Sequence, residues 1–204
     1  MLIDYKKTEK ELYQPKATPS IIDVAEMVFI AVDGKGNPNT SVEYATAIEV
    51  LYGLSYTIKM GNKSVLEYVI PPLEGLWWLS GGEVADYSDK DSFCWTLMIR
   101  QPEFVTNRVF EDAKKTLGKK KSTLDLSKIR LVKCTEGLCV QVMHTGPYDD
   151  EPTTITSMEQ YAIRNGYAFE INEVRRHHEI YLSDPRRVVP EKLKTVIRYP
   201  IKVV

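Results

Sequence analysis

The sequence of 204 residues has few cysteines, almost no net charge and no long apolar run. Its 27 Lys and Arg residues nearly balance 28 Asp and Glu residues, so the chain has no basic field that would hold nucleic acid. No apolar stretch approaches the ~20 residues of a membrane span, and the polar first residues do not resemble a signal peptide. Three cysteines lie in apolar, strand-like segments (Cys94, Cys134 and Cys139). Reduced, buried thiols are favoured, which predicts a cytoplasmic protein.

The chain also lacks the patterns of common metal, nucleotide and nucleophile sites. It contains no Cys-x-x-Cys, no His-Glu-x-x-His, no glycine-rich phosphate loop and no nucleophile elbow. His177 and His178 are adjacent, so on a strand they would point to opposite faces and could not chelate one ion. The sequence therefore predicts no metal and no cofactor.

The first half of the chain reads as a strand, a helix and further strands. A β-rich run from Met27 to Val32 ends in turn residues, and Thr40 with Glu43 forms a capping-box pattern. Helical spacing follows until Gly53, which predicts the end of that helix. The next apolar runs are strand candidates, at Tyr56–Met60, Val65–Ile70, Leu76–Leu79 and Phe93–Ile99.

A second helix is expected from Pro102 to Gly118, followed by a β-hairpin. Ile129–Cys134 and Leu138–Met143 flank Thr135-Glu136-Gly137, a short segment that is typical of a hairpin turn. A turn at Gly146 and a helix that ends at Gly166 complete a pattern like that of the first half.

Spacings between corresponding residues indicate an internal duplication. The turn glycines Gly34 and Gly146 are 112 residues apart, as are Glu67 and Glu179, and the helix-ending glycines 53 and 166 are 113 apart. We expect an arm at 1–20 and a single domain at 21–204. Within it, repeat one would span about 27–101, a connection about 102–134, and repeat two about 138–204. The fold class is α+β, with antiparallel sheets and a ligand cleft between two strand–helix–strand–strand repeats.

Large aromatic residues suggest how such a cleft would be lined. Trp77 and Trp78 are adjacent on a strand, so they face opposite sides, and one of them would line a second surface. The alternative is one buried indole and one that lies over a sheet edge. Trp95 offers a third large ring, and Tyr148, on a rigid Gly-Pro turn, either donates a hydrogen bond to a ligand or simply packs.

Carboxylates in strand contexts are the candidates for chemistry. Along one strand, His177, Glu179 and Tyr181 share a face, and a glutamate buried there would have to be paired or used. An exposed Glu179 on the outer face is the alternative. The acidic cluster Asp149–Glu151 lies where a helix begins, so helix capping is favoured over metal binding.

Three long motifs resemble one known family. Leu73-Glu74-Gly75-Leu76-Trp77-Trp78, the segment from His144 to Thr154 and the segment from His177 to Pro185 are similar to signatures of stand-alone GyrI-like proteins. The segments 34–38 and 194–200 fit as well, so the resemblance covers roughly residues 20–204. It implies a duplicated α+β fold with a small-molecule site between the repeats.

The resemblance also carries functional expectations. Related effector domains have a glutamate in the last strand that recognises cationic drugs, but the matching position here is Val196. Regulators of this family carry a DNA-binding helix-turn-helix, for which this chain has no room. Similar stand-alone members suggest a hydrolase that opens the electrophilic cyclopropane of DNA-alkylating compounds, and hence a role in detoxification and drug resistance.

We therefore expect a flat aromatic or hydrophobic small molecule as the partner of a monomer or homodimer. Glu179 or Glu74 would activate water, while the other carboxyl, Tyr148 or Tyr181, would stabilise the developing phenolate. The predicted ligand contacts are Trp77, Trp78, Trp95, His144, Tyr181 and Glu67. A non-catalytic protein that sequesters a drug or metabolite predicts the same aromatic pocket, and a gyrase inhibitor is a third possibility.

Overall fold

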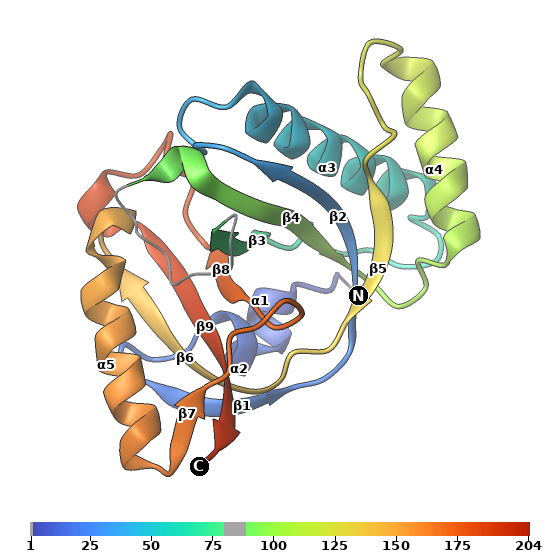
Figure 1. The fold of residues 1–204 in the computed structure, drawn as a ribbon. Coiled ribbons are helices and arrows are strands. Elements are labelled where there is room, and N and C mark those ends of the chain that lie inside the picture. Colours follow the sequence, from blue (N-terminus) through green and yellow to red (C-terminus); the bar gives the residue numbers. More distant parts are fainter. Residues whose placement is uncertain (1, 80–88) are drawn as a thin grey trace.

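The computed structural model describes residues 2–79 and 89–204 as one antiparallel sheet with helices packed on it (Figure 1). The strands follow the order β1-β6-β9-β8-β3-β4-β2-β5, and β7 pairs with β9. Their bounds are β1 Ser20–Val24, β2 Met27–Lys35, β3 Leu73–Leu79, β4 Phe93–Gln101, β5 Arg130–Cys134, β6 Gly137–Thr145, β7 Tyr167–Phe169, β8 His177–Tyr181 and β9 Lys194–Val203.

The helices are short at the N-terminus and longer where they cover the sheet. They are α1 Tyr5–Thr8, α2 Lys10–Tyr13, α3 Val42–Gly61, α4 Asn107–Lys120 and α5 Glu151–Arg164, with short 3-10 turns η1 Lys90–Ser92, η2 Tyr148–Asp150 and η3 Pro190–Lys192. None of the helices in the described part of the chain has the length and apolar character to cross a membrane.

Two units with the same order of elements make up the sheet, which confirms the predicted α+β duplication. The unit β2-α3-β3-β4 is repeated as β6-α5-β8-β9, and β3 and β8 meet at the centre of the sheet. Figure 1 shows α3 over β2 and β4, and α5 beside β6. The spacing that matches β2 to β6 is 137 − 27 = 110 residues, close to the spacing of the turn glycines.

The predicted hairpin at Thr135-Glu136-Gly137 is wrong. β5 pairs with β2, whereas β6 pairs with β1 and β9, so β5 and β6 lie in different halves. β1 and β2 are related in the same way, because two residues connect them and yet they do not pair. Each half therefore donates one edge strand to the other, which ties the repeats together.

The predicted end of the first helix at Gly53 is also wrong. α3 begins after Ser41, whose hydroxyl accepts a hydrogen bond from the Tyr44 N–H, and it continues to Gly61. Leu51, Leu54 and Ile58 keep one buried stripe at helical spacing, so the expected strand at 56–60 is helix. Gly53 instead lies where α3 meets Leu117 of α4. Around residues 65–70 the structure has only an isolated bridge between Ile3 and Tyr68.

The two faces of the sheet are covered differently. The helix face, which carries Trp77 and Glu179, lies under α3 in the first half and α5 in the second. The arm face, which carries Glu74 and His178, lies under the N-terminal segment, and Tyr13 is buried there against Ile180 and Val196.

Gly34 gives a test of the packing of the first half. A Cβ at this position would overlap the ring of Trp95, which is fully buried below it. We expect Gly34→Ala to lower the free energy of unfolding by about 1–3 kcal/mol, because the Trp95 indole has no space to move into. Thermal or urea unfolding measures the effect. Gly61→Ala is the matched control, since a Cβ there meets nothing within 4 Å. Equal stability of the two variants would contradict this packing.

Candidate functional site

The central strands β3 and β8 bring most of the predicted functional side chains to the helix face. Their antiparallel register sets Gly75 opposite Glu179 and Trp77 opposite His177. Because alternate residues share a face, Trp77, His177, Glu179 and Tyr181 all lie on the side covered by α3 and α5. Tyr44 of α3 and Glu151 of α5 complete this group, which we call the helix-face cluster.

Two carboxylates and a histidine from the second repeat form the acidic part of the helix-face cluster. His177 Nε2 lies 2.7 Å from Glu179 Oε1, and both side chains are buried. Glu151, the first residue of α5, is 1% exposed and offers a carboxylate oxygen within 4.8 Å of donor atoms of His177 and Glu179. Its Oε1 has no hydrogen-bond partner in the described part of the chain.

Burial and the neighbouring Glu179 raise the pKa of Glu151 well above its ordinary value of 4.5. Two carboxylates in one dry site cannot both ionise without strong repulsion, so the pair holds a proton. Burial and the contact with Glu179 therefore favour the protonated form of Glu151. Sequence reasoning assigned Glu151 to helix capping, and it missed this contact because no local pattern places α5 against β8.

Phenol groups surround the carboxylates. The Tyr181 hydroxyl accepts a hydrogen bond from Trp77 Nε1 at 2.8 Å, and it lies in hydrogen-bond contact with Glu179. Burial and the charge of Glu179 raise the pKa of Tyr181 far above 10. The same two causes raise the pKa of Tyr148 to about 12. Both phenols are thus neutral donors at physiological pH.

The aromatic part of the cluster comes from both halves, with Tyr44 and Trp77 in the first and Tyr148 and Tyr181 in the second. The rings of Tyr44 and Trp77 are tilted by 31° with centroids 6.0 Å apart, and both are half-buried. Tyr148 meets Tyr181 edge to face at 5.9 Å. These half-buried rings form the aromatic side of the cluster.

Gly75 is required for this arrangement. A Cβ on Gly75 would lie 2.7 Å from Trp77 Nε1 and 3.0 Å from the Tyr181 hydroxyl, so any larger residue would separate the pair. A glycine inside a strand is a signal of close approach that the sequence offered, since glycine weakens strands otherwise.

The structure places Glu74, Trp78 and Glu67 away from this cluster, whereas Trp95 lies beneath it and meets the Tyr44 ring edge-on at 5.3 Å. Glu74 lies on the arm face, so it does not converge with Glu179, which faces the other side of the sheet, and the expected grouping of the two carboxylates is wrong. Trp78 is also on that face, under the Arg176 guanidinium at 4.7 Å. Trp95 is on the helix face but fully buried in the core, and Glu67 lies exposed in the loop after α3, where the expected strand is absent.

His144 has a supporting position. Its Nδ1 lies 2.8 Å from the Thr154 hydroxyl and its Nε2 lies 3.0 Å from the Pro147 carbonyl oxygen. Both ring nitrogens are therefore used to hold the turn that carries Tyr148 and Glu151. His144 orients the site from behind and leaves no polar atom for a ligand.

A buried ionic network lies behind the cluster, on the arm face. His178 stands between Glu136 at 2.8 Å and Glu74 at 3.0 Å, and Arg198 pairs with Glu136 at 2.6 Å. Burial alone would lower the pKa of His178, but the two carboxylates raise it to about 9. Burial would raise the pKa of Glu136, yet His178 and Arg198 lower it to about 2. The four charges balance.

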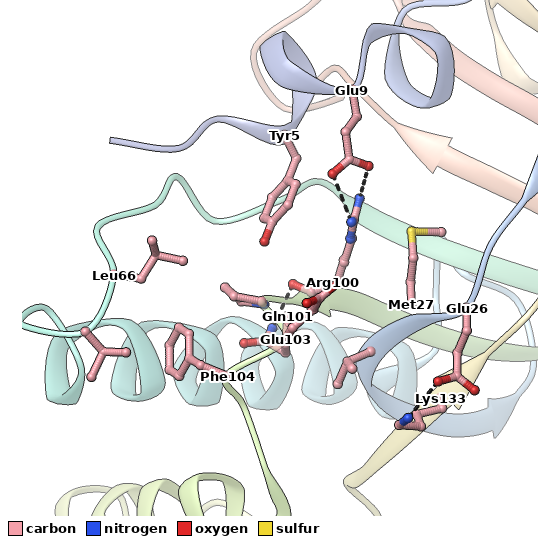
Figure 2. Close-up of a pocket in the computed structure, with 13 residues that line it drawn as sticks. Tyr5, Glu9, Glu26, Met27, Leu66, Arg100, Gln101, Glu103, Phe104 and Lys133 are labelled. Atoms are coloured by element: carbon pink, nitrogen blue, oxygen red, sulfur yellow. Dashed lines mark hydrogen bonds and ion pairs between the residues drawn. The ribbon is translucent and has the colours of Figure 1, made fainter. Parts of the chain in front are cut away.

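A separate pocket of about 550 Å³ lies between the N-terminal segment and the end of the first half (Figure 2). Figure 2 shows Glu9 reaching the Arg100 guanidinium with two interactions and Lys133 paired with Glu26. None of the predicted site residues lines this pocket. Its charged groups are mostly paired with each other.

The chain belongs to the family of GyrI-like small-molecule-binding domains, whose model matches residues 17–202. No curated protein sequence matches it.

Two solved structures from Listeria innocua are strongly similar. One, an uncharacterized conserved protein, is 46% identical with a TM-score of 0.93, over 98% of this chain and 100% of that one. The other, a hydrolase, is 45% identical with a TM-score of 0.92, over 99% and 100%. The C-terminal domain of EcmrR, at 13% identity and a TM-score of 0.58 over 92% and 98%, shares the fold.

Glu151, His177 and Glu179 are also the one group of potential metal donors among residues 2–79 and 89–204. The sequence predicts that no metal is needed, and this stays a prediction. We expect elemental analysis of the purified protein to find no stoichiometric metal, and chelator to leave the melting temperature and turnover unchanged. Loss of either property, restored by one added ion, would contradict the prediction.

The buried network predicts how stability depends on pH. The pKa of His178 is raised from 6.5 to about 9 in the folded state. Its contribution to the free energy of unfolding is therefore complete below pH 6.5 and is lost as pH rises through 9. Glu136, lowered from 4.5 to about 2, contributes fully above pH 4.5 and loses its contribution as pH falls towards 2. Urea unfolding from pH 3 to 10 measures both. His178→Gln should remove the loss of stability between pH 6.5 and 9. An unchanged dependence of stability on pH would refute the assignment of that loss to His178.

Proposed function

We propose that this protein is a hydrolase that uses water to open a strained, electrophilic cyclopropane ring of DNA-alkylating compounds. The observation that carries the proposal is the contact of Glu179 with neutral acids inside a partly dry, aromatic-lined group. The Listeria innocua neighbour described as a hydrolase supports the reaction class. Neither observation names the substrate.

In the proposed reaction, a flat chromophore stacks on Trp77 and Tyr44. Glu179 takes a proton from water as the water oxygen bonds to the cyclopropane carbon. The ring C–C bond breaks, and its electrons move to the conjugated carbonyl oxygen, which becomes a phenolate. Tyr148 donates a hydrogen bond to that oxygen, because its hydroxyl makes no hydrogen bond within the described part of the chain.

No step of this mechanism uses Glu74. Its carboxylate belongs to the buried network on the arm face, and Tyr13 and His178 occupy the space in front of it. We therefore propose that Glu74 supports β8 from behind and that water activation belongs to Glu179 alone.

A comparison of Glu179→Gln with Glu74→Gln tests the proposal. Glu179→Gln should lower kcat by about 10²–10⁴-fold while ligand binding persists, since only the base is lost. Glu74→Gln should lower the melting temperature but keep kcat within a few-fold in assays run below that temperature. Product formation by mass spectrometry and binding by tryptophan fluorescence are measured separately.

The two alternative results have clear meanings. Full turnover by Glu179→Gln would remove it as the base. Stoichiometric depletion of the compound by the wild type, without product, would replace the hydrolase with a protein that sequesters its ligand.

Gly75 gives an independent test of the aromatic part of the site. We expect Gly75→Ala to weaken ligand binding by tenfold or more, because its methyl group would separate Trp77 from Tyr181. Gly61→Ala serves as the control for a glycine-to-alanine change in the same half of the chain. Titration of both variants with the same ligand measures the effect, and equal affinities would argue against a ligand at this pair.

A further inference from the structure

The acids and the base of the helix-face cluster are unusually close to one another. Glu179 contacts His177, Glu151 and Tyr181 directly, and the Tyr148 ring packs on Tyr181. In a cyclopropane conjugated to a carbonyl, the attacked carbon and the oxygen that gains charge are several bonds apart. The contact between Glu179 and the phenols also suits a substrate in which the attacked carbon and the leaving oxygen are bonded to each other.

We propose that the cluster also hydrolyses epoxides that carry an aromatic ring, and that it converts them to vicinal diols. This inference rests on the proposed hydrolase function, because it uses the same base. In an epoxide the attacked carbon and the leaving oxygen are neighbours in one strained ring. Glu179 and a neighbouring phenol can therefore act together on the attacked carbon and the leaving oxygen.

The burial pattern of the cluster agrees with this assignment. Glu151, His177 and Glu179 are buried, whereas Trp77, Tyr44, Tyr148 and Tyr181 are only half-buried. A small ring that approaches Glu179 past the half-buried rings would meet the phenols before the buried carboxylate. An aryl substituent would stack on Trp77 and Tyr44, whose ring centroids are 6.0 Å apart.

The step balances without a further reactant. The oxygen of water bonds to the epoxide carbon while the C–O bond of the ring breaks. Glu179 accepts the proton of the water, and Tyr148 donates its phenolic proton to the epoxide oxygen. Glu179 then releases its proton and Tyr148 regains one, both through solvent. The net reaction consumes one epoxide and one water and yields one diol.

The test uses the full chain with racemic styrene oxide, and phenylethanediol is measured by mass spectrometry. We expect diol well above the rate without enzyme. Glu179→Gln should lose about 10²-fold or more and Tyr148→Phe at least tenfold, each assayed below its own melting temperature. Glu159→Gln, an exposed carboxylate on α5, is the matched control and should keep the wild-type rate. No diol above background, or full activity in Glu179→Gln, would overturn the inference.

A single turnover in ¹⁸O-labelled water tests the role of Glu179. Attack by water puts the label in the diol at the first turnover. Attack by the carboxylate itself would give unlabelled diol first, and that result would refute the role of base.

A parallel assay with a cyclopropyl-dienone separates this inference from the proposed function. Opening of the cyclopropane without any diol from the epoxide would refute the epoxide inference and leave the proposed function intact. Diol formation without opening of the cyclopropane would support the epoxide activity and refute the proposed substrate. Failure of both reactions would refute the shared base.

Discussion

The pairing of β3 with β8 is the constraint on which the rest of the structure depends. Because it sets Gly75 opposite Glu179, a strand position without a side chain lies beside the carboxylate. The neighbouring Trp77 and Tyr181 lean into that space and meet at 2.8 Å. A slip of one residue would turn Glu179 to the arm face and His178 to the helix face, which would exchange a functional group with a structural one.

The ionic network on the arm face opposes such a slip. His178 is held between Glu74 and Glu136, and Glu136 also pairs with Arg198, so a shifted β8 would leave charges buried without partners. Removing one member of a buried pair costs about 3–5 kcal/mol, which is a large share of the stability of most domains. We infer that the network mainly fixes the register of β8, since well-packed apolar residues in its place would stabilise the core equally well. The geometry of the helix-face cluster thus depends on charge pairing on the arm face.

The sequence predicted features within single elements better than it predicted contacts between elements. Alternation along β8 correctly placed His177, Glu179 and Tyr181 on one face, and the repeated order of elements confirmed the duplicated fold. The β5–β6 turn was misread because a short glycine-containing segment looks the same whether its strands pair or separate. The prediction that Glu74 would join Glu179 failed for a related reason. Which side of β3 faces α3, and whether Glu151 meets Glu179, depend on how the helices pack on the sheet, and no pattern within one element contains that information.

The duplication supplies symmetry to the scaffold but not to the chemistry. Val42 begins α3 and is 80% exposed, whereas Glu151 begins α5 and is almost fully buried against Glu179. The first repeat contributes Tyr44 and Trp77, which have large apolar surfaces, and the second contributes the carboxylates. In the proposed reaction, the first repeat supplies the stacking surface and the second supplies the base and the phenols. New ring contacts would then alter substrate choice without moving the acid pair, while the paired β3 and β8 keep the two in reach.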